Sequence, residues 1–66
     1  MTLEEQLDEQ EHMILKAMKE NRSQTIVYRM MEVYEDLYAE IKNPNQKQES
    51  DYINLYFKYE MYVRKN

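Results

Sequence analysis

Apolar residues recur at helical spacing in the first two thirds of the chain. The first stripe consists of Leu3, Leu7, Ile14 and Met18 and is interrupted by Gln10. The second stripe has the 3,4,3,4 spacing typical of coiled-coil packing and consists of Val27, Met30, Tyr34, Leu37 and Ile41. Thr2 and Glu5 have the spacing of a capping box, and Ser23 is a favoured N-cap. These patterns predict helices over about 3–20 and 24–42.

A third stretch is apolar around most of its circumference. Pro44 disfavours helical geometry in the preceding residue, so we expect the second helix to end before it and residues 46–49 to form a polar loop. With Ser50 or Asp51 as its cap, a third helix is predicted over about 51–64. Its apolar face is too wide for packing on one neighbour, which indicates either burial on two sides or an exposed aromatic surface.

The fold class predicted from these elements is all-α: one three-helix domain spanning residues 1–66. A chain of roughly 60 residues buries only about 60% of the surface that its unfolded form exposes, and it usually needs a staple such as a disulfide, a metal or a partner subunit. We therefore predict a homodimer built on the third helix and part of the second, although the same aromatic residues would also suit a monomer core. The predicted interface comprises Tyr34, Tyr38, Tyr52, Tyr56, Tyr59, Tyr62, Leu55 and Val63.

Composition removes several classes of function. The chain has no glycine, which excludes phosphate-binding glycine loops, and no cysteine, which excludes disulfides and thiolate metal sites. Its single histidine, His12, lies beside Asp8 and Glu11 on a face predicted to be open, where it is expected to be solvated. No enzyme, no cofactor and no metal site is predicted.

The sequence also predicts where the protein resides. Its start is acidic, unlike a signal peptide, and its apolar stretches are far shorter than the ~20 residues that cross a bilayer. We expect no membrane association and a cytoplasmic location. The high usage of Lys, Glu, Asn and Tyr is typical of a low-GC bacterium or one of its phages.

Acidic residues are clustered, although the net charge is only −4. Several have like-charged neighbours four residues away, as in Glu4–Asp8 and Glu32–Asp36, which costs a helix a few tenths of a kcal/mol per pair. Such rows can imitate nucleic-acid phosphates to a basic protein. The predicted partner-binding residues are Glu4, Glu5, Asp8, Glu9, Glu11, Glu32, Glu35, Asp36 and Glu40.

In size, helicity and clustered acid, the chain resembles the small acidic proteins that bacteria and phages use as antirepressors and inhibitors. It shares no diagnostic motif with them, so no functional residue is carried over. The resemblance and the acidic rows predict inhibition of a basic DNA-binding protein by mimicry of DNA charge, without direct nucleic-acid binding. Two alternatives stay open: an adaptor or antirepressor that binds through the tyrosine-rich surface, and a helix-turn-helix regulator with Ser23 opening its recognition helix.

Overall fold

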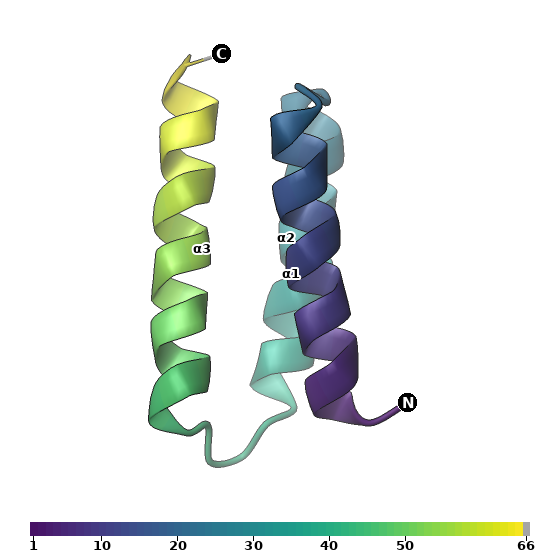
Figure 1. Ribbon diagram of the computed structural model, residues 1–66, viewed down its shortest axis with the longest axis vertical. Coiled ribbons are helices and arrows are strands. Elements are labelled where there is room, and N and C mark those ends of the chain that lie inside the picture. The colour runs from purple at the N-terminus through teal and green to yellow at the C-terminus, as the bar shows by residue number, and fades with distance from the viewer. Residues whose placement is uncertain (66) are drawn as a thin grey trace.

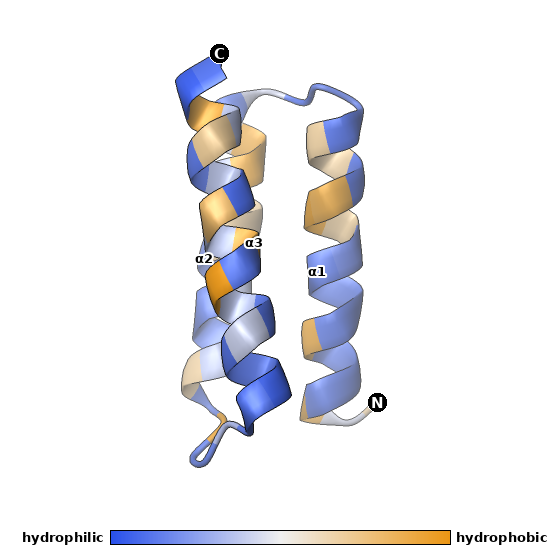
Figure 2. Ribbon diagram, turned by 60° about the vertical axis from the view of Figure 1, so that its left-hand side comes forward, coloured by the Kyte–Doolittle hydropathy of each residue, from blue (hydrophilic) through white to orange (hydrophobic). Residues whose placement is uncertain are grey.

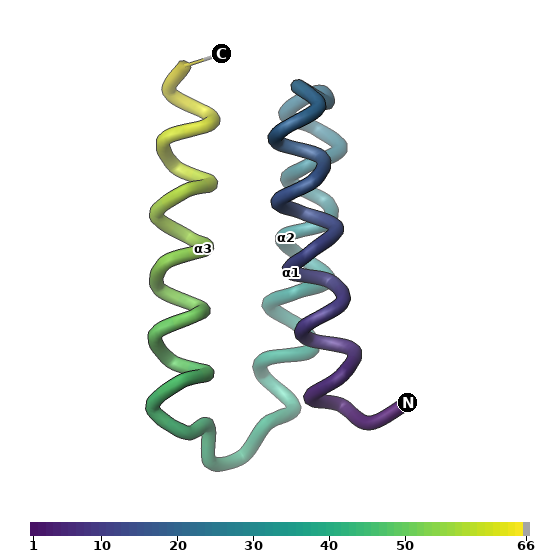
Figure 3. The backbone as a smooth tube through the Cα atoms, in the orientation of Figure 1, coloured from purple at the N-terminus to yellow at the C-terminus, as the bar shows by residue number. Residues whose placement is uncertain are grey.

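The computed structural model describes residues 1–65 and confirms the all-α prediction. Three helices follow one another in an up-down-up order: α1 (Leu3–Lys19), α2 (Gln24–Ala39) and α3 (Gln46–Lys65). Helices α1 and α2 form an antiparallel hairpin, and α3 stands along one side of it (Figure 1). The backbone trace shows a tight turn between α1 and α2 and a wider connection between α2 and α3 (Figure 3).

The caps of α1 explain how a chain without glycine makes its first turn. The predicted capping box is present, with Thr2 and Glu5 satisfying each other's backbone amides. At the other end Asn21 takes the left-handed conformation, with φ 58°. The amides of Asn21 and Arg22 donate to the carbonyls of Met18 and Ala17, which completes a Schellman motif. Asparagine tolerates this geometry better than most residues and here replaces glycine.

Helix α2 starts as predicted but ends earlier. The Ser23 side chain accepts a hydrogen bond from the Ile26 amide. The helix ends at Ala39, three residues before the predicted limit of Lys42. The amides of Glu40 and Ile41 turn instead to carbonyls three residues back, which tightens the last turn before Pro44.

Helix α3 begins five residues before the predicted start, so the expectation of a polar loop at 46–49 was wrong. The cap is Asn45, not Ser50 or Asp51. Its side-chain oxygen accepts from the Gln48 amide at 2.8 Å, and the Gln48 side chain accepts from the Asn45 amide at 2.9 Å. This reciprocal pair is a capping box built from Asn and Gln, and it gives the polar residues a helical role.

The core lies where the three helices face one another, and tyrosines fill the space between α2 and α3. Tyr52 is central: its ring centroid lies 4.4 Å from that of Tyr38 and 5.9 Å from that of Tyr34. Tyr56 and Tyr59 continue the row along α3. The fully buried side chains include Ile14, Val27, Met31, Tyr34 and Leu55.

Residues of the predicted dimer interface take part in this packing within a single chain. Tyr34 and Leu55 are each only 1% exposed within a single chain, so neither can meet a second copy. The other predicted residues are half-buried, and the tyrosines among them pack against the core; these residues are Tyr38, Tyr52, Tyr56, Tyr59, Tyr62 and Val63. The tyrosines of α3 therefore serve the monomer's own core, while Ile53, Phe57 and Met61 on the same helix remain 64%, 65% and 43% exposed.

Side-chain hydrogen bonds help to hold the helices together. Gln10, which interrupts the apolar stripe of α1, donates to the Met30 carbonyl of α2 at 3.0 Å. Gln24 donates to the Val63 carbonyl at 3.2 Å, and the Tyr62 hydroxyl donates to the Arg22 carbonyl. The last two bonds hold the end of α3 against the turn between α1 and α2.

Candidate functional site

The fold separates charge along the long axis of the molecule. One end contains residues 1–11 and 32–55, and the other contains residues 12–31 and 56–65 (Figure 1). The first end contains eleven carboxylates and two cations, which gives a formal side-chain charge of −9. The second contains two carboxylates and seven cations, which gives a charge of +5. We call these the acidic half and the basic half. A net charge of −4 therefore conceals a strongly polarised molecule.

The charges of α2 show that helix stability alone does not explain this polarity. In α1 and α3, acidic residues lie in the first turn and basic residues in the last, which complements the helix dipole. Helix α2 has no such arrangement. It carries Arg29 in its first half and Asp36 near its C-terminus, against its own dipole. This order nevertheless places the carboxylates of α2 beside those of α1, because the two helices are antiparallel.

Seven of the nine predicted acidic residues are exposed, and two are turned inward. The exposed ones are Glu4, Glu5, Asp8, Glu9, Glu32, Asp36 and Glu40. Glu11 and Glu35 are half-buried, and each lies near a residue of α3, Asp51 for Glu11 and Tyr56 for Glu35. Within residues 1–65, none of the nine forms an ion pair with Lys, Arg or His.

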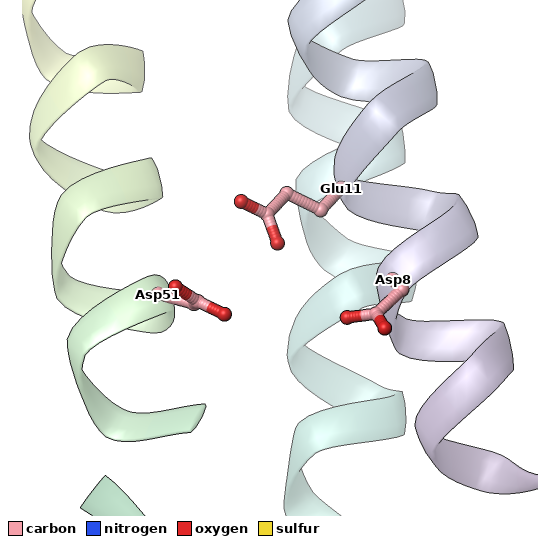
Figure 4. Close-up of side chains that lie close together, drawn as sticks. All are labelled: Asp8, Glu11 and Asp51. Atoms are coloured by element: carbon pink, nitrogen blue, oxygen red, sulfur yellow. The ribbon is translucent and has the colours of Figure 1, made fainter. Parts of the chain in front are cut away.

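Part of the acidic half forms a cleft between α1 and the start of α3. Its charged lining consists of Glu4, Asp8, Glu11, Lys47 and Asp51, and we call it the carboxylate cleft. Figure 4 shows Glu11 and Asp51 reaching toward each other from opposite walls, with Asp8 one turn below Glu11. One oxygen from each of these three carboxylates lies within 4.8 Å of the other two.

Burial and the neighbouring charged groups raise two pKa values in the cleft. Partial burial, followed by the negative charges of Asp51 and Asp8, raises the pKa of Glu11. The pKa of Lys47 is also raised, first by its hydrogen bond to Asp51, whose oxygen lies 2.9 Å from the ammonium nitrogen, and then by the charge of that carboxylate. Lys47 thus supplies positive charge at the rim of a cleft that retains an excess of negative charge.

Such a cleft is suited to holding cations. Convergent carboxylate oxygens are ligands of Ca²⁺ and Mg²⁺, and they also accept hydrogen bonds from lysine and arginine side chains. Asp51 and Lys47 did not appear among the predicted site residues. Their i,i+4 spacing was the available signal, because it is the spacing at which opposite charges pair on a helix.

Outside the cleft, His12 lies at the surface of α1. Its ring is exposed, and its Nδ1 atom lies 2.9 Å from the backbone carbonyl oxygen of Asp8. The Asp8 carboxylate contributes instead to the cleft. Over the described part of the chain, no helix has the length and apolar character needed to cross a membrane.

Comparisons with known proteins add no relative. No protein-family model matches the chain, and no significant match was found among curated proteins or among solved structures.

Proposed function

We propose that this protein binds a basic DNA-binding protein through its acidic half and competes with DNA phosphate for that partner's Lys and Arg side chains. It acts by binding and not by catalysis. The observation that carries the proposal is the collection of eleven carboxylates in one half of the molecule, most of them exposed and without an intramolecular cation. Unpaired carboxylates that repel one another gain most from an external cation.

The carboxylate cleft is the centre of the proposed contact. Glu4 and Asp8 are exposed at its edge, while Glu11 and Asp51 provide further oxygens inside it. A lysine or arginine of the partner would replace repulsion between these groups by charge-assisted hydrogen bonds. The polarity of the whole molecule would orient the acidic half toward the partner during the encounter.

The helix-turn-helix alternative fits the arrangement of α1 and α2 less well. The helices of that motif cross at about 90–120°, with the second free to enter a major groove. Here α1 and α2 lie side by side in an antiparallel hairpin (Figure 1), and the exposed carboxylates Glu32 and Asp36 follow on the second helix. Phosphate would be repelled by this surface.

The test uses two variants with the same change in charge. Glu4→Lys with Asp8→Lys alters the edge of the cleft, and Glu20→Lys with Glu60→Lys alters two carboxylates of the basic half. Bacterial proteins captured on the wild-type chain are identified, and their binding is measured at low and high salt with and without duplex DNA.

The proposal expects the captured partner to be a DNA-binding protein that DNA displaces. We expect the cleft variant to bind it at least about tenfold more weakly, and the control variant to bind within about twofold of wild type. Equal binding by both variants, or a partner that DNA does not displace, would contradict the proposal. Binding that survives high salt and both variants would favour the adaptor alternative.

A further inference from the structure

The side of the α1–α2 hairpin that faces away from α3 carries an apolar groove. Its lining comes from α1, α2 and the turn between them, without any residue of α3. Met13 lies at its centre and is 48% exposed, with Ile26 at 44% and Val33 at 48%. Half-buried Met30 and Leu37 form the floor. The groove runs along most of the hairpin, since its two parts share Met13.

Charges along this groove change sign from one end to the other. Glu9 lines the end in the acidic half, and helical spacing places Asp36 and Glu40 on the same side of α2 as Val33. Lys16 and Arg22 line the end in the basic half. The Glu20 carboxylate at that end lies 3.4 Å from the Arg22 guanidinium nitrogen, so its charge is partly offset.

These two properties make the groove complementary to itself. A twofold axis through the region of Met13 would place the apolar strip of one copy on that of another, with the two hairpins antiparallel. The same rotation would bring the acidic end of each groove against the basic end of its partner. A cationic or anionic foreign helix would match only one of the two ends.

We propose that two copies of this chain associate through the α1–α2 groove to form an antiparallel dimer. The four helices of the two hairpins then bury the apolar strip, while α3 of each copy lies on the outside. This assembly provides the additional apolar burial that a chain of 66 residues lacks when alone. It differs from the predicted association through the tyrosines of α3, which already fill the monomer's core.

The dimer leaves the carboxylate cleft accessible, while it places Glu9, Asp36 and Glu40 of the acidic half at the interface. The carboxylate cleft lies between α1 and α3, away from the groove, so each dimer presents two clefts near opposite ends. Self-association does not depend on the proposed function, and the experiments below contain no partner protein.

Sedimentation equilibrium of the full chain tests the interface. At 10–100 µM (roughly the range for a moderate dimer) we expect a species of twice the 8.2 kDa chain mass. Val33→Glu places a charge in the groove, whereas Phe57→Glu is its control on α3, where Phe57 is 65% exposed in a hollow shared with Leu15 and Met18 of α1. Both positions are exposed, so both variants should keep their helical circular dichroism.

The proposal requires that Val33→Glu raise the dimer dissociation constant at least about tenfold while Phe57→Glu leaves it within about twofold. A wild-type chain that stays at 8.2 kDa overturns it. So does any other pattern, including dissociation by Phe57→Glu alone, which would place the interface on α3.

Cross-linking tests the antiparallel orientation, because the chain has no native cysteine. Arg22→Cys lies at the basic end of the groove and Glu40→Cys at the acidic end. In an antiparallel dimer, a mixture of the two variants should form a disulfide-linked dimer at least about fivefold faster than either alone, because only the mixed pair meets across the interface. Faster cross-linking of each variant with itself would indicate a parallel dimer and contradict the proposal.

Discussion

At the scale of single residues, Glu11 shows how location changes the role of a carboxylate. The sequence places it with Glu4, Asp8 and Glu9 in one acidic cluster, and nothing in its neighbours along the chain sets it apart. In the structure it is half-buried and faces Asp51, which comes from a helix forty residues later. Its environment could not be predicted from sequence, because it depends on the position of α3.

Glu11 should make the protein less stable at neutral pH than at mildly acidic pH. Because the pKa of Glu11 is raised in the folded state, folding takes up a proton at pH values between the ordinary value of 4.5 and the folded pKa. As the pH rises through this window, Glu11 loses its proton in the folded protein and the free energy of unfolding falls. We expect Glu11→Gln to increase the free energy of unfolding at pH 7 by a few tenths of a kcal/mol in low salt. Near pH 4 most of this gain should be absent.

Urea denaturation at the two pH values measures this effect. The control is Glu60→Gln, which removes a carboxylate whose oxygen lies 3.9 Å from the Arg64 guanidinium and should bring no gain. An equal gain from Glu11→Gln at both pH values would show that the effect comes from helix propensity and not from charge.

Tyr34 should limit stability at alkaline pH. Burial and the neighbouring carboxylates, Glu11 first among them, raise the pKa of its phenol, so the folded protein retains a proton that the unfolded chain releases above about pH 10. Stability is therefore expected to be level below that pH and to fall above it. Tyr34→Phe should reduce the loss between pH 9 and pH 11 by about 1 kcal/mol.

Denaturant unfolding followed by circular dichroism checks this expectation. Tyr28→Phe is the control, because Tyr28 is 53% exposed on α2. A fall in stability that is the same in wild type and in Tyr34→Phe would show that Tyr34 is not the group that links folding to alkaline pH.

At the scale of elements, local signals predicted the starts of α1 and α2 but missed the start of α3. Thr2 with Glu5 and Ser23 act as the caps that their side-chain chemistry indicates. The start of α3 was missed because residues 45–48 contain only polar side chains, which the apolar pattern cannot assign. Asn45 and Gln48 have the spacing of a capping box, but that signal is recognised most readily with Ser or Thr followed by Glu.

The cap of α3 can be tested by paired alanine substitutions. Asn45→Ala removes the acceptor for the Gln48 amide and should lower the free energy of unfolding by about 1 kcal/mol. Ser50→Ala alters a position that lies inside the helix and should be neutral or stabilise by up to about 0.5 kcal/mol. Urea denaturation measures both variants. A larger loss of stability from Ser50→Ala than from Asn45→Ala would support the later helix start that the apolar pattern predicted.

At the scale of the whole molecule, the acidic rows could be predicted from the sequence, but their assembly in one half of the molecule could not. The clusters on α1 and α2 and the all-α class were predictable, because both depend on local spacing. The position of these clusters beside Asp51 in one acidic half was not predictable, because it depends on the antiparallel order of the helices and on the early start of α3. The hydropathy colouring likewise shows apolar positions along all three helices, but only packing separates core from surface (Figure 2).

If the acidic rows exist for a partner, they should lower the stability of the free protein. Asp8→Asn with Glu32→Gln removes one carboxylate from each row at exposed positions outside the α1–α2 groove. The like-charge pairs Glu4–Asp8 and Glu32–Asp36 then disappear, so we expect about 0.5–1 kcal/mol of added stability at low ionic strength. The gain should fade near 0.5 M salt, where charges are screened within about 4 Å.

The control neutralises two carboxylates of the basic half, Glu20→Gln with Glu60→Gln, which lie beside Arg22 and Arg64. These changes remove favourable pairs and should leave stability unchanged or slightly lower, as thermal unfolding would show. A stabilised acidic-half variant that also loses affinity for the captured partner is the combination expected of residues kept for binding at a cost in folding. If neutralising Asp8 and Glu32 instead destabilises the protein in low salt, their carboxylates support the fold, and the case for a recognition surface loses its physical basis.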